Sequence, residues 1–215
     1  MTSSGDREHL LARLERAGTS VDAAALDALW QYFALLARWN PRVNLTALPL
    51  NPPADETFDR LFVEPIVAAK HIEPRNSGTV PVRWVDLGSG GGSPAIPVKI
   101  VRPAWILTMV EAKERKAAFL REATRALHLE ETEIANVRFE DLNGECATAD
   151  VVTVRAVRLD DAFADIARKL LRRDGILAVF SSSEASLSGF DRERCVSLVP
   201  QSSAALTLLR VPRGT

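Results

Sequence analysis

The sequence predicts an α/β fold: a mostly parallel sheet with helices on both faces, preceded by a helical extension. Short runs rich in β-branched residues recur from residue 82 onward, and stretches of helical periodicity lie between several of them. This alternation is typical of βαβ crossovers. The residues before the first such run show only helical patterns. With 215 residues, 47% of them hydrophobic, the chain can build one sizeable core.

The N-terminal part of the chain predicts helices separated by loop signals. The predicted helices span residues 7–17, 22–39 and 55–71. Gly18 stands where the first should end, and Asp22 stands at the N-cap of the second. Prolines mark residues 49–55 as a loop, and the stretch 73–81 is rich in Pro, Asn, Ser and Gly. We therefore expect a helical extension over residues 1–75, packed on the core.

Residues 76–215 predict a Rossmann-like domain that forms one integrated unit with this extension. The predicted parallel strands are VRWVD (82–86), WILTMVE (105–111), IANVRF (134–139), DVVTVRAV (150–157) and GILAVFSS (175–182). Helices are predicted over 113–129 and 160–173. The segments VSLVP (196–200) and ALTLLRVP (205–212) predict a terminal antiparallel pair.

Composition narrows the class of protein. The net charge of −1 and the pI of about 6.3 argue against a uniformly basic nucleic-acid binder, although a local patch can hide in such a total. Cys146 and Cys195 form no CxxC pair and no cluster with the three histidines, so we expect no metal. The N-terminus does not resemble a signal peptide, and no apolar run is long enough for a membrane span. We expect a cytoplasmic monomer with no membrane partner.

A glycine-rich loop follows the first predicted strand. DLGSGGG, residues 86–92, would turn the chain at the carboxyl edge of the sheet, where α/β proteins bind ligands. Glycines let the backbone approach a ligand closely and accept positive φ angles. A glycine-rich turn without a ligand is the alternative. Pro94 and Pro97 predict that no regular helix follows immediately.

The loop's spacing favours one ligand over two others. A dinucleotide fingerprint needs glycine where Ser93 stands, and a P-loop needs a lysine that does not follow. An acid, Asp86, precedes Gly88 by two residues, and Gly90 follows. Asp86 could face a cationic ligand but would sit poorly beside a pyrophosphate. S-adenosylmethionine carries a sulfonium and an ammonium and no phosphate, so the spacing favours it over NAD.

Two further strand ends carry acids. Glu111 ends the second predicted strand, where a carboxylate can accept both ribose hydroxyls of a nucleoside. The alternative is an acid that stabilises the N-terminus of the next helix. Phe139 and Glu140 follow the third strand, where an adenine would find an apolar wall and an acceptor for its amine. Glu140 could also be an ordinary solvated acid.

Several motifs together resemble the glucose-inhibited division protein B family. ARWNPRVNLTAL (37–48) is similar to that family's Trp-Asn-x-x-x-Asn-Leu-Thr element, and DLGSGGGSPAIP (86–97) to its glycine loop. RKAAFL (115–120), VRFED (137–141) and VRAV (154–157) extend the resemblance over roughly residues 30–180. The family comprises class I methyltransferases that methylate N7 of a guanine in 16S ribosomal RNA.

The resemblance implies a set of cofactor contacts. They would fall on Gly88, Ser93, Phe139, Glu140 and Arg155. Asp86, Gly90 and Glu111 join them because of the spacing of the acids and glycines after the strands. Arg155 interrupts a buried-looking strand near its carboxyl end. It could position the substrate or be a snorkelling or salt-bridged core arginine.

The chain also departs from the family pattern. Leu61 and Glu64-Pro65 replace a His and an Asp-Ser, Ser181–Ser183 stand where Lys-Gly is common, and Ser93 and Ala95 replace a Leu and a Gly. These departures lie where RNA or the target base would be held, and they spare the loop's glycines.

The expected function is methyl transfer from S-adenosylmethionine to guanine N7 of 16S ribosomal RNA, free or within the small ribosomal subunit. Two alternatives stay open: a class I methyltransferase acting on a small molecule or protein, and a non-catalytic module that binds S-adenosylmethionine. Guanine N7 has a free lone pair, so no general base is expected. Basic side chains on two predicted helices could contact RNA or be solvated faces: Lys113, Arg115, Lys116, Arg121 and Arg125, and Arg168, Lys169, Arg172 and Arg173.

Overall fold

A computed structural model describes residues 4–75, 81–142 and 149–212. Within these ranges, seven strands form one sheet in the order β3-β2-β1-β4-β5-β7-β6. They are β1 (Arg83–Leu87), β2 (Ile106–Val110), β3 (Thr132–Ala135), β4 (Ala149–Arg155), β5 (Leu171–Ser181), β6 (Asp191–Ser197) and β7 (Ala205–Arg210). β1 to β5 run parallel, β7 is antiparallel to β5, and β6 is antiparallel to β7. The predicted parallel sheet is therefore confirmed; an antiparallel pair does follow it, but its first strand, β6, lies mostly before the predicted segment 196–200.

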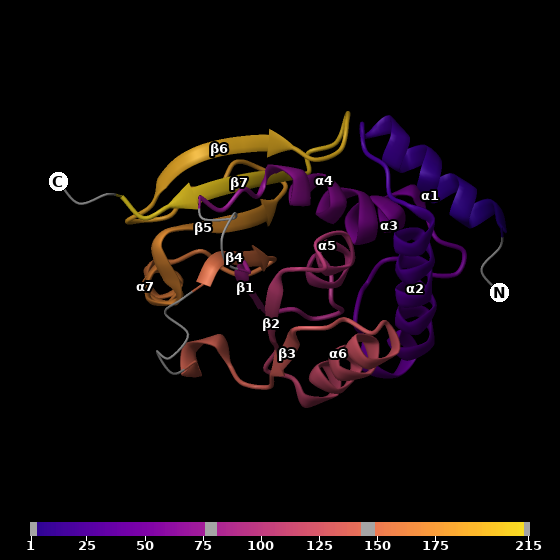
Figure 1. Ribbon diagram of the computed structural model, residues 1–215, viewed down its shortest axis with the longest axis horizontal. Helices are drawn as coiled ribbons and strands as arrows, with labels where there is room; N and C mark the ends of the chain where they lie inside the picture. Colours follow the sequence, from indigo (N-terminus) through magenta and orange to yellow (C-terminus); the bar gives the residue numbers. More distant parts are fainter. Residues whose placement is uncertain (1–3, 76–80, 143–148, 213–215) are drawn as a thin grey trace.

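Helices cover both faces of the sheet (Figure 1). They are α1 (Ser4–Arg16), α2 (Ala23–Val43), α3 (Asp55–Phe58), α4 (Glu64–His71), α5 (Ala95–Val101), α6 (Glu114–Ala126) and α7 (Asp161–Leu170), with the π-helical turn η1 (Asp59–Val63) and the 3₁₀ turn η2 (Phe139–Asp141). Figure 1 shows α7 on the left of the sheet and the N-terminal helices on the right. Asp22 caps α2 as predicted, because its side chain accepts a hydrogen bond from Ala25 N at 2.7 Å.

The period-two alternation of side chains along a strand divides the core between the two faces. Val85 and Leu87 of β1 pack on the side of α7, in a cluster with Phe163. Trp84 points to the opposite side, in a cluster with Phe62 that takes in residues of the N-terminal helices. Asp86, two residues after Trp84, therefore belongs to the face that the N-terminal helices cover.

The third strand and the C-terminal strands differ from prediction. The strand predicted over 134–139 is β3, which ends at Ala135, and Phe139 begins the turn η2. The strand predicted over 196–200 is mostly the connection to β7, since β6 ends at Ser197. Both are edge strands of the sheet; β6 is largely solvent-exposed, and β3 is mostly half-buried. Edge strands carry polar and charged residues, so an apolar pattern does not mark them.

The prediction that two prolines prevent a helix directly after the loop is wrong. α5 begins at Ala95, immediately after Pro94, and contains Pro97. Pro97 lies in the first turn, where the missing backbone N–H has no intrahelical acceptor, so proline is tolerated there.

The helix predicted over 55–71 is continuous but changes pitch. α3, η1 and α4 follow one another without a break, and Glu64 N donates to Asp59 O across the π-helical turn. Pro65 has no N–H to donate to the preceding turn. The change of pitch and this missing donor together leave the backbone carbonyls of Arg60 and Leu61 to accept from Ser93 and Arg155.

The division at residue 75 stays a prediction. Residues 76–80, directly after it, lie outside the described residues, as does Cys146. Cys195 is a free, exposed cysteine.

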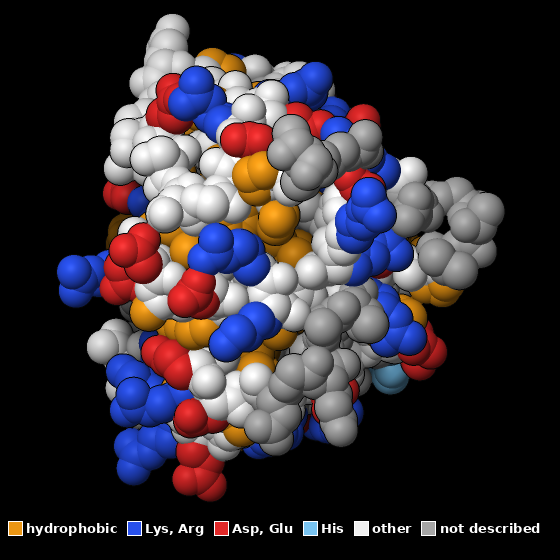
Figure 2. All heavy atoms as spheres, turned by 90° about the vertical axis from the view of Figure 1, so that its left-hand side faces the viewer, with side chains coloured by type: hydrophobic (Ala, Val, Ile, Leu, Met, Phe, Trp, Pro, Cys, Tyr) orange, Lys and Arg blue, Asp and Glu red, His pale blue; other side chains and the backbone are white. Residues whose placement is uncertain are grey.

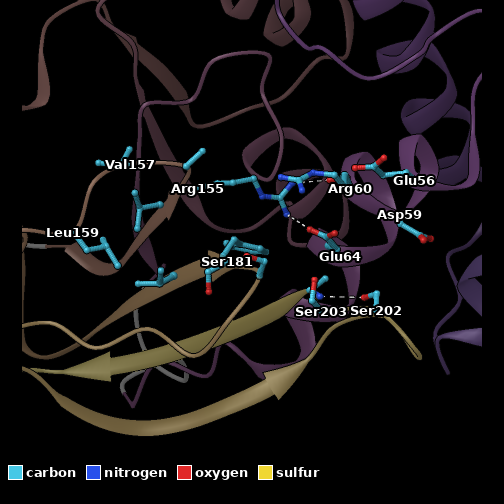
Figure 3. A pocket seen from close by; sticks show the side chains of 16 residues that line it. Glu56, Asp59, Arg60, Glu64, Arg155, Val157, Leu159, Ser181, Ser202 and Ser203 are labelled. Carbon is cyan, nitrogen blue, oxygen red and sulfur yellow. Dashed lines mark hydrogen bonds and ion pairs between the residues drawn. The ribbon is translucent and has the colours of Figure 1, made fainter.

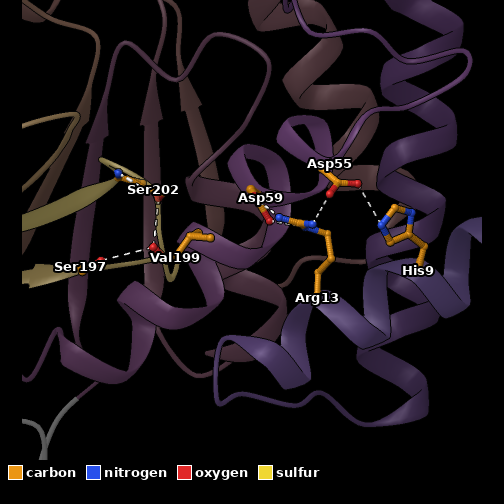
Figure 4. Close-up of polar contacts among 8 residues, drawn as sticks. His9, Arg13, Asp55, Asp59, Ser197, Val199 and Ser202 are labelled. Carbon is orange, nitrogen blue, oxygen red and sulfur yellow. Dashed lines mark hydrogen bonds and ion pairs between the residues drawn. The ribbon is translucent and has the colours of Figure 1, made fainter.

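An ion-pair cluster ties α1 to the start of this helical run (Figure 4). The Arg13 guanidinium donates to both carboxylate oxygens of Asp59, at 2.6 and 2.5 Å, and to Asp55 at 2.5 Å. His9 Nε2 lies 3.0 Å from the other oxygen of Asp55. The Arg13 and Asp59 side chains are only 11% and 15% exposed. The cluster therefore holds η1 against the N-terminal helix.

We expect Arg13→Ala to lower the free energy of unfolding by about 1–3 kcal/mol, because it removes charge-assisted hydrogen bonds and leaves Asp59 half-buried and unpaired. Arg7→Ala is the matched control, since the pair of Arg7 with Asp27 lies at the surface, where such pairs contribute about 0–1 kcal/mol. Urea unfolding of both variants measures the difference. Equal losses in the two variants would contradict this account of the cluster.

Candidate functional site

A buried polar chain lies at the carboxyl end of β1. Asp86 pairs in register with Thr153 of β4. Trp84 Nε1 donates to Thr153 Oγ1 at 2.8 Å, and that hydroxyl donates to Asp86 Oδ1 at 2.5 Å. All three residues are essentially inaccessible to solvent. Sheet alternation places them on one face, so the acid is oriented by its neighbours rather than by solvent.

The Asp86 carboxylate is only partly satisfied by the protein. Among the described residues, Oδ2 has no hydrogen-bond partner. Burial raises the pKa of Asp86 to about 6, although the nearby hydroxyls of Ser89 and Thr153 oppose the rise. A buried acceptor left without a partner is costly. The residue thus fits a ligand that brings positive charge or a donor to this end of β1.

The glycine loop takes backbone conformations that favour glycine. Gly88, Gly90 and Gly92 have φ angles of 73°, 55° and 90°. A Cβ on Gly91 would lie 3.0 Å from the carbonyl oxygen of Leu45, so the loop approaches the N-terminal segment closely. The buried Tyr32 Oη donates to Gly91 O at 2.6 Å. The loop is thus held from the side of α2.

The Trp-Asn-x-x-x-Asn-Leu-Thr element builds the turn that meets this loop. Asn40 Oδ1 accepts from the backbone N–H groups of Leu45 and Thr46, at 2.8 and 2.9 Å, and Nδ2 donates to Thr46 O. Asn44 ends α2 in the left-handed conformation with a φ of 55°. Asparagine tolerates that conformation better than most residues. The motif therefore positions Leu45 against Gly91.

Two cavities adjoin at the carboxyl edge of the sheet. The loop cavity, about 500 Å³, is bounded by Gly88–Gly91, Tyr32 and the segment Leu45–Pro49. The strand-end cavity, about 540 Å³, lies over the ends of β4 and β5 and includes Ser181 and Ser202 (Figure 3). Both cavities are lined by Glu56, Arg60, Arg155 and Ala156. A ligand in one cavity would therefore contact a ligand in the other beside Arg155.

Arg155 extends from the end of β4 into this shared wall. Its Nη2 donates to Glu64 Oε2 at 2.7 Å and its Nη1 to Arg60 O at 2.7 Å, with Ser93 Oγ at 3.4 Å. The guanidinium carbon lies 4.7 Å from the ring centroid of Phe180, a cation–π distance. Arg155 is therefore a largely buried, salt-bridged arginine that also lines both cavities.

Ser93 and Glu111 brace the loop. Ser93 Oγ lies 3.1 and 3.2 Å from the carbonyls of Arg60 and Leu61 in the π-helical turn, and Ser93 lines the loop cavity. Glu111 Oε2 accepts from Gly90 N at 2.9 Å, and Oε1 accepts from Lys113 N at 2.8 Å. Each carboxylate oxygen can accept a further hydrogen bond.

Asp86, Glu111, Phe139 and Glu140 line neither cavity. The half-buried ring of Phe139 packs edge-on against Phe163 at 6.1 Å, and Glu140 is exposed. Their assignment to the cofactor stays a prediction, as does that of the other site residues.

Sequence reasoning missed Tyr32 and the role of Glu64. Tyr32 falls at helical spacing with Leu29 and Leu36 on the buried face of α2, and a phenol on such a face needs a partner. Burial raises the pKa of Tyr32, which keeps the phenol a donor. Glu64 is an acid inside the apolar run LFVEPIVAA. A lone charge in such a run indicates a buried ion pair.

Several of the basic side chains suggested for RNA contacts have acidic partners. Arg125 pairs with Glu122, Arg168 with Asp165 and Arg172 with Asp150. On the face of the molecule that carries α7, Figure 2 shows Lys and Arg interspersed with Asp and Glu rather than gathered into one patch. RNA contact by these two groups stays a prediction.

The described part of the chain offers neither a metal-ligand cluster nor a helix suited to a membrane. No group of three or more His, Cys, Asp and Glu residues is arranged there to hold a metal ion. None of the helices in those ranges has the length and apolar character needed to cross a bilayer.

Comparison with known proteins identifies relatives over most of the chain. The family model described as rRNA small subunit methyltransferase G matches residues 25–203. A "Ribosomal RNA small subunit methyltransferase G" of Xanthomonas euvesicatoria pv. vesicatoria is 39% identical over 170 residues, covering 77% of this chain and 74% of its own. A protein of the same name from Leptothrix cholodnii is 31% identical over 212 residues, covering 88% and 93%.

Solved structures share the fold at low identity. A SAM-dependent methyltransferase from Aquifex aeolicus aligns with a TM-score of 0.55 at 12% identity, covering 73% of this chain and 92% of its own. An MtNAS mutant in complex with S-adenosylmethionine aligns with a TM-score of 0.58 at 13% identity, covering 98% and 80%. The fold is the Rossmann-like fold of class I methyltransferases.

The raised pKa of Asp86 predicts a pH-dependent stability difference. The pKa is about 6 when folded and 3.8 as a free side chain. The folded state thus holds this proton more tightly, and the associated stability is present below pH 3.8 and lost as pH rises through 6. Asp86→Asn lacks this titration. We expect its free energy of unfolding, relative to wild type, to rise by about 2–3 kcal/mol between pH 4 and pH 7.5. Urea unfolding at both pH values checks this, and a pH-independent difference would contradict it.

Proposed function

We propose that this chain, which belongs to the rRNA small subunit methyltransferase G family, methylates N7 of a guanine in 16S ribosomal RNA with S-adenosylmethionine as donor. The observation that carries the proposal is the shared wall at Arg155. One cavity there is bounded by the glycine loop and the other by the ends of β4 and β5. Donor and acceptor in adjoining cavities would meet at that wall.

The residues around the loop suit the donor. Gly88 and Gly90 leave room for a ligand against the backbone. Asp86 supplies buried negative charge toward a cation, and Glu111 keeps lone pairs for ribose hydroxyls while it braces Gly90. Ser93 completes the wall of the loop cavity. We assign the adenine to Phe139 and Glu140 at the end of β3.

Methylation at N7 requires the protein to align the two reactants, and it requires no proton transfer. S-adenosylmethionine supplies a methyl group on a sulfonium, and the electrons of the broken C–S bond stay on sulfur while the N7 lone pair forms the new bond. N7 carries no proton in neutral guanine, so no base is needed. Arg155 orients the acceptor, because a planar guanidinium can stack on a base or donate to its acceptor edge. The rate enhancement comes from holding N7, the methyl carbon and the sulfur in one line.

The surroundings of the site define the partner. Arg60 is exposed at the shared wall, where it can contact an RNA phosphate. With a net charge of −1, the chain is suited to a substrate that offers protein as well as RNA contacts, such as an assembling small ribosomal subunit. We place the enzyme, as a monomer, in the cytoplasm with that substrate.

The cofactor assignment predicts that Gly88→Val weakens S-adenosylhomocysteine binding at least tenfold. A branched side chain at a φ of 73° strains the loop, and its Cβ would lie 3.4 Å from Val157 Cγ2, so the methyl groups beyond it would crowd that side chain. Gly18→Val is the matched control, because Gly18 has a φ of 67° and a Cβ added there would meet no atom within 4 Å. Isothermal calorimetry on both folded variants measures the effect. Unchanged affinity in Gly88→Val would contradict the assignment.

The substrate assignment predicts loss of one N7-methylguanosine from 16S ribosomal RNA when the gene is deleted. Primer extension after borohydride and aniline cleavage detects that modification. Purified protein should restore it on small subunits from the deletion strain. An unchanged modification pattern would instead favour a small-molecule or protein substrate. Cofactor binding without turnover on any substrate would favour a non-catalytic module.

A further inference from the structure

We propose that Glu64 is the counter-charge of Arg155: it keeps the wall between the two cavities electrically neutral, so that a cationic methyl donor can bind beside a buried guanidinium. The inference rests on the proposed function, because it concerns the charge of the donor. It assigns to Glu64 a positioning and electrostatic role at the site, without direct participation in methyl transfer.

The Glu64–Arg155 pair is sequestered from water. Glu64 Oε2 and Arg155 Nη2 are 2.7 Å apart, and the two side chains are 9% and 12% exposed. Arg155 is further fixed by Arg60 O and by the ring of Phe180. Charges in such surroundings are weakly screened, so their effect on a neighbouring charge is large.

Other acids near the wall cannot replace Glu64. Asp59 lines the strand-end cavity, but both of its carboxylate oxygens accept from Arg13. Glu56 lines both cavities, but its side chain is exposed to solvent, where its field is screened. Asp86 lines neither cavity, and its Oδ1 accepts from Thr153 rather than from Arg155.

Without Glu64, neither cation of the wall would have a carboxylate hydrogen-bonded to it among the described residues. Arg60 and Arg155 both line it, and a sulfonium would have to bind against them. At an effective dielectric constant of about 20, two like charges about 10 Å apart cost about tenfold in affinity. With Glu64 present, the buried pair carries no net charge, and Arg155 can stay at the wall where it meets the acceptor.

The position of Glu64 also matches the direction in which charge moves. Methyl transfer removes one positive charge from sulfur and leaves one on the purine ring, since N7 gains a fourth electron pair bond without losing a proton. Glu64 lines the strand-end cavity, which we assign to the acceptor. Its carboxylate therefore lies beside the cavity in which the cationic product forms.

The experiment compares two ligands that differ by one methyl group and one charge. S-adenosylmethionine is a sulfonium, and S-adenosylhomocysteine is a neutral thioether. We expect Glu64→Gln, at pH 8, to weaken binding of S-adenosylmethionine about tenfold more than binding of S-adenosylhomocysteine, both measured by calorimetry. A residue that only supports the fold would weaken both equally, so an unchanged ratio of the two Kd values overturns the proposal.

Three companion variants make the result specific. Glu64→Asp keeps the charge and should keep the ratio within about twofold of wild type. Glu56→Gln removes an exposed carboxylate from the same wall, and its ratio of the two Kd values should also stay within about twofold of wild type. If Glu64→Gln fails to fold, the double variant Glu64→Gln with Arg155→Gln takes its place, because it removes both charges of the pair. Its ratio of the two Kd values should also stay within about twofold of wild type. A tenfold shift in any of these three overturns the proposal.

The inference and the proposed function fail in different ways. If wild-type protein binds neither ligand, or binds both without methylating the small subunit, the proposed function is wrong. If wild-type protein binds and methylates while the Kd ratio of Glu64→Gln matches that of wild type, the role of Glu64 alone is wrong.

Discussion

The alternation of side chains along β1 and β4 is the constraint on which the site depends. Because successive residues point to opposite faces, Trp84 and Asp86 share a face with Thr153 and Arg155. That face is the one the N-terminal helices cover. A shift of one residue in the register between these two strands would turn the carboxylate or the guanidinium toward α7 and dismantle the site.

The N-terminal helices complete the site as well as cover the sheet. Tyr32 holds the glycine loop through Gly91, and Glu64 neutralises the guanidinium at the end of β4. The π-helical turn and the proline after it leave carbonyls that receive Ser93 and Arg155. π-helical turns are often found at functional sites. The extension and the sheet therefore cannot be separated without losing both the loop's support and the counter-charge.

Local patterns predicted the fold well where apolar periodicity was strong. The central strands and the long helices lie close to their predicted ranges, because buried elements must show an apolar face. The edges were predicted poorly. β6 is charged and exposed, β3 is short, and the helix after the loop accommodates Pro97 in its first turn. In the edge strands, partial exposure to solvent removes the apolar pattern that marks a buried strand. In α5, the position of Pro97 in the first turn makes proline compatible with a helix.

The sequence by itself determined the class of ligand, because the spacing of an acid and glycines after a strand is a local property of the backbone. It also indicated Arg155, because a charge inside an apolar strand stands out. Only the tertiary structure decided that Arg155 is paired with Glu64, 91 residues earlier, and that Tyr32 reaches the loop. Those contacts join elements distant in the chain, and their partners are chosen by packing on a shared face of the sheet, which no local pattern encodes.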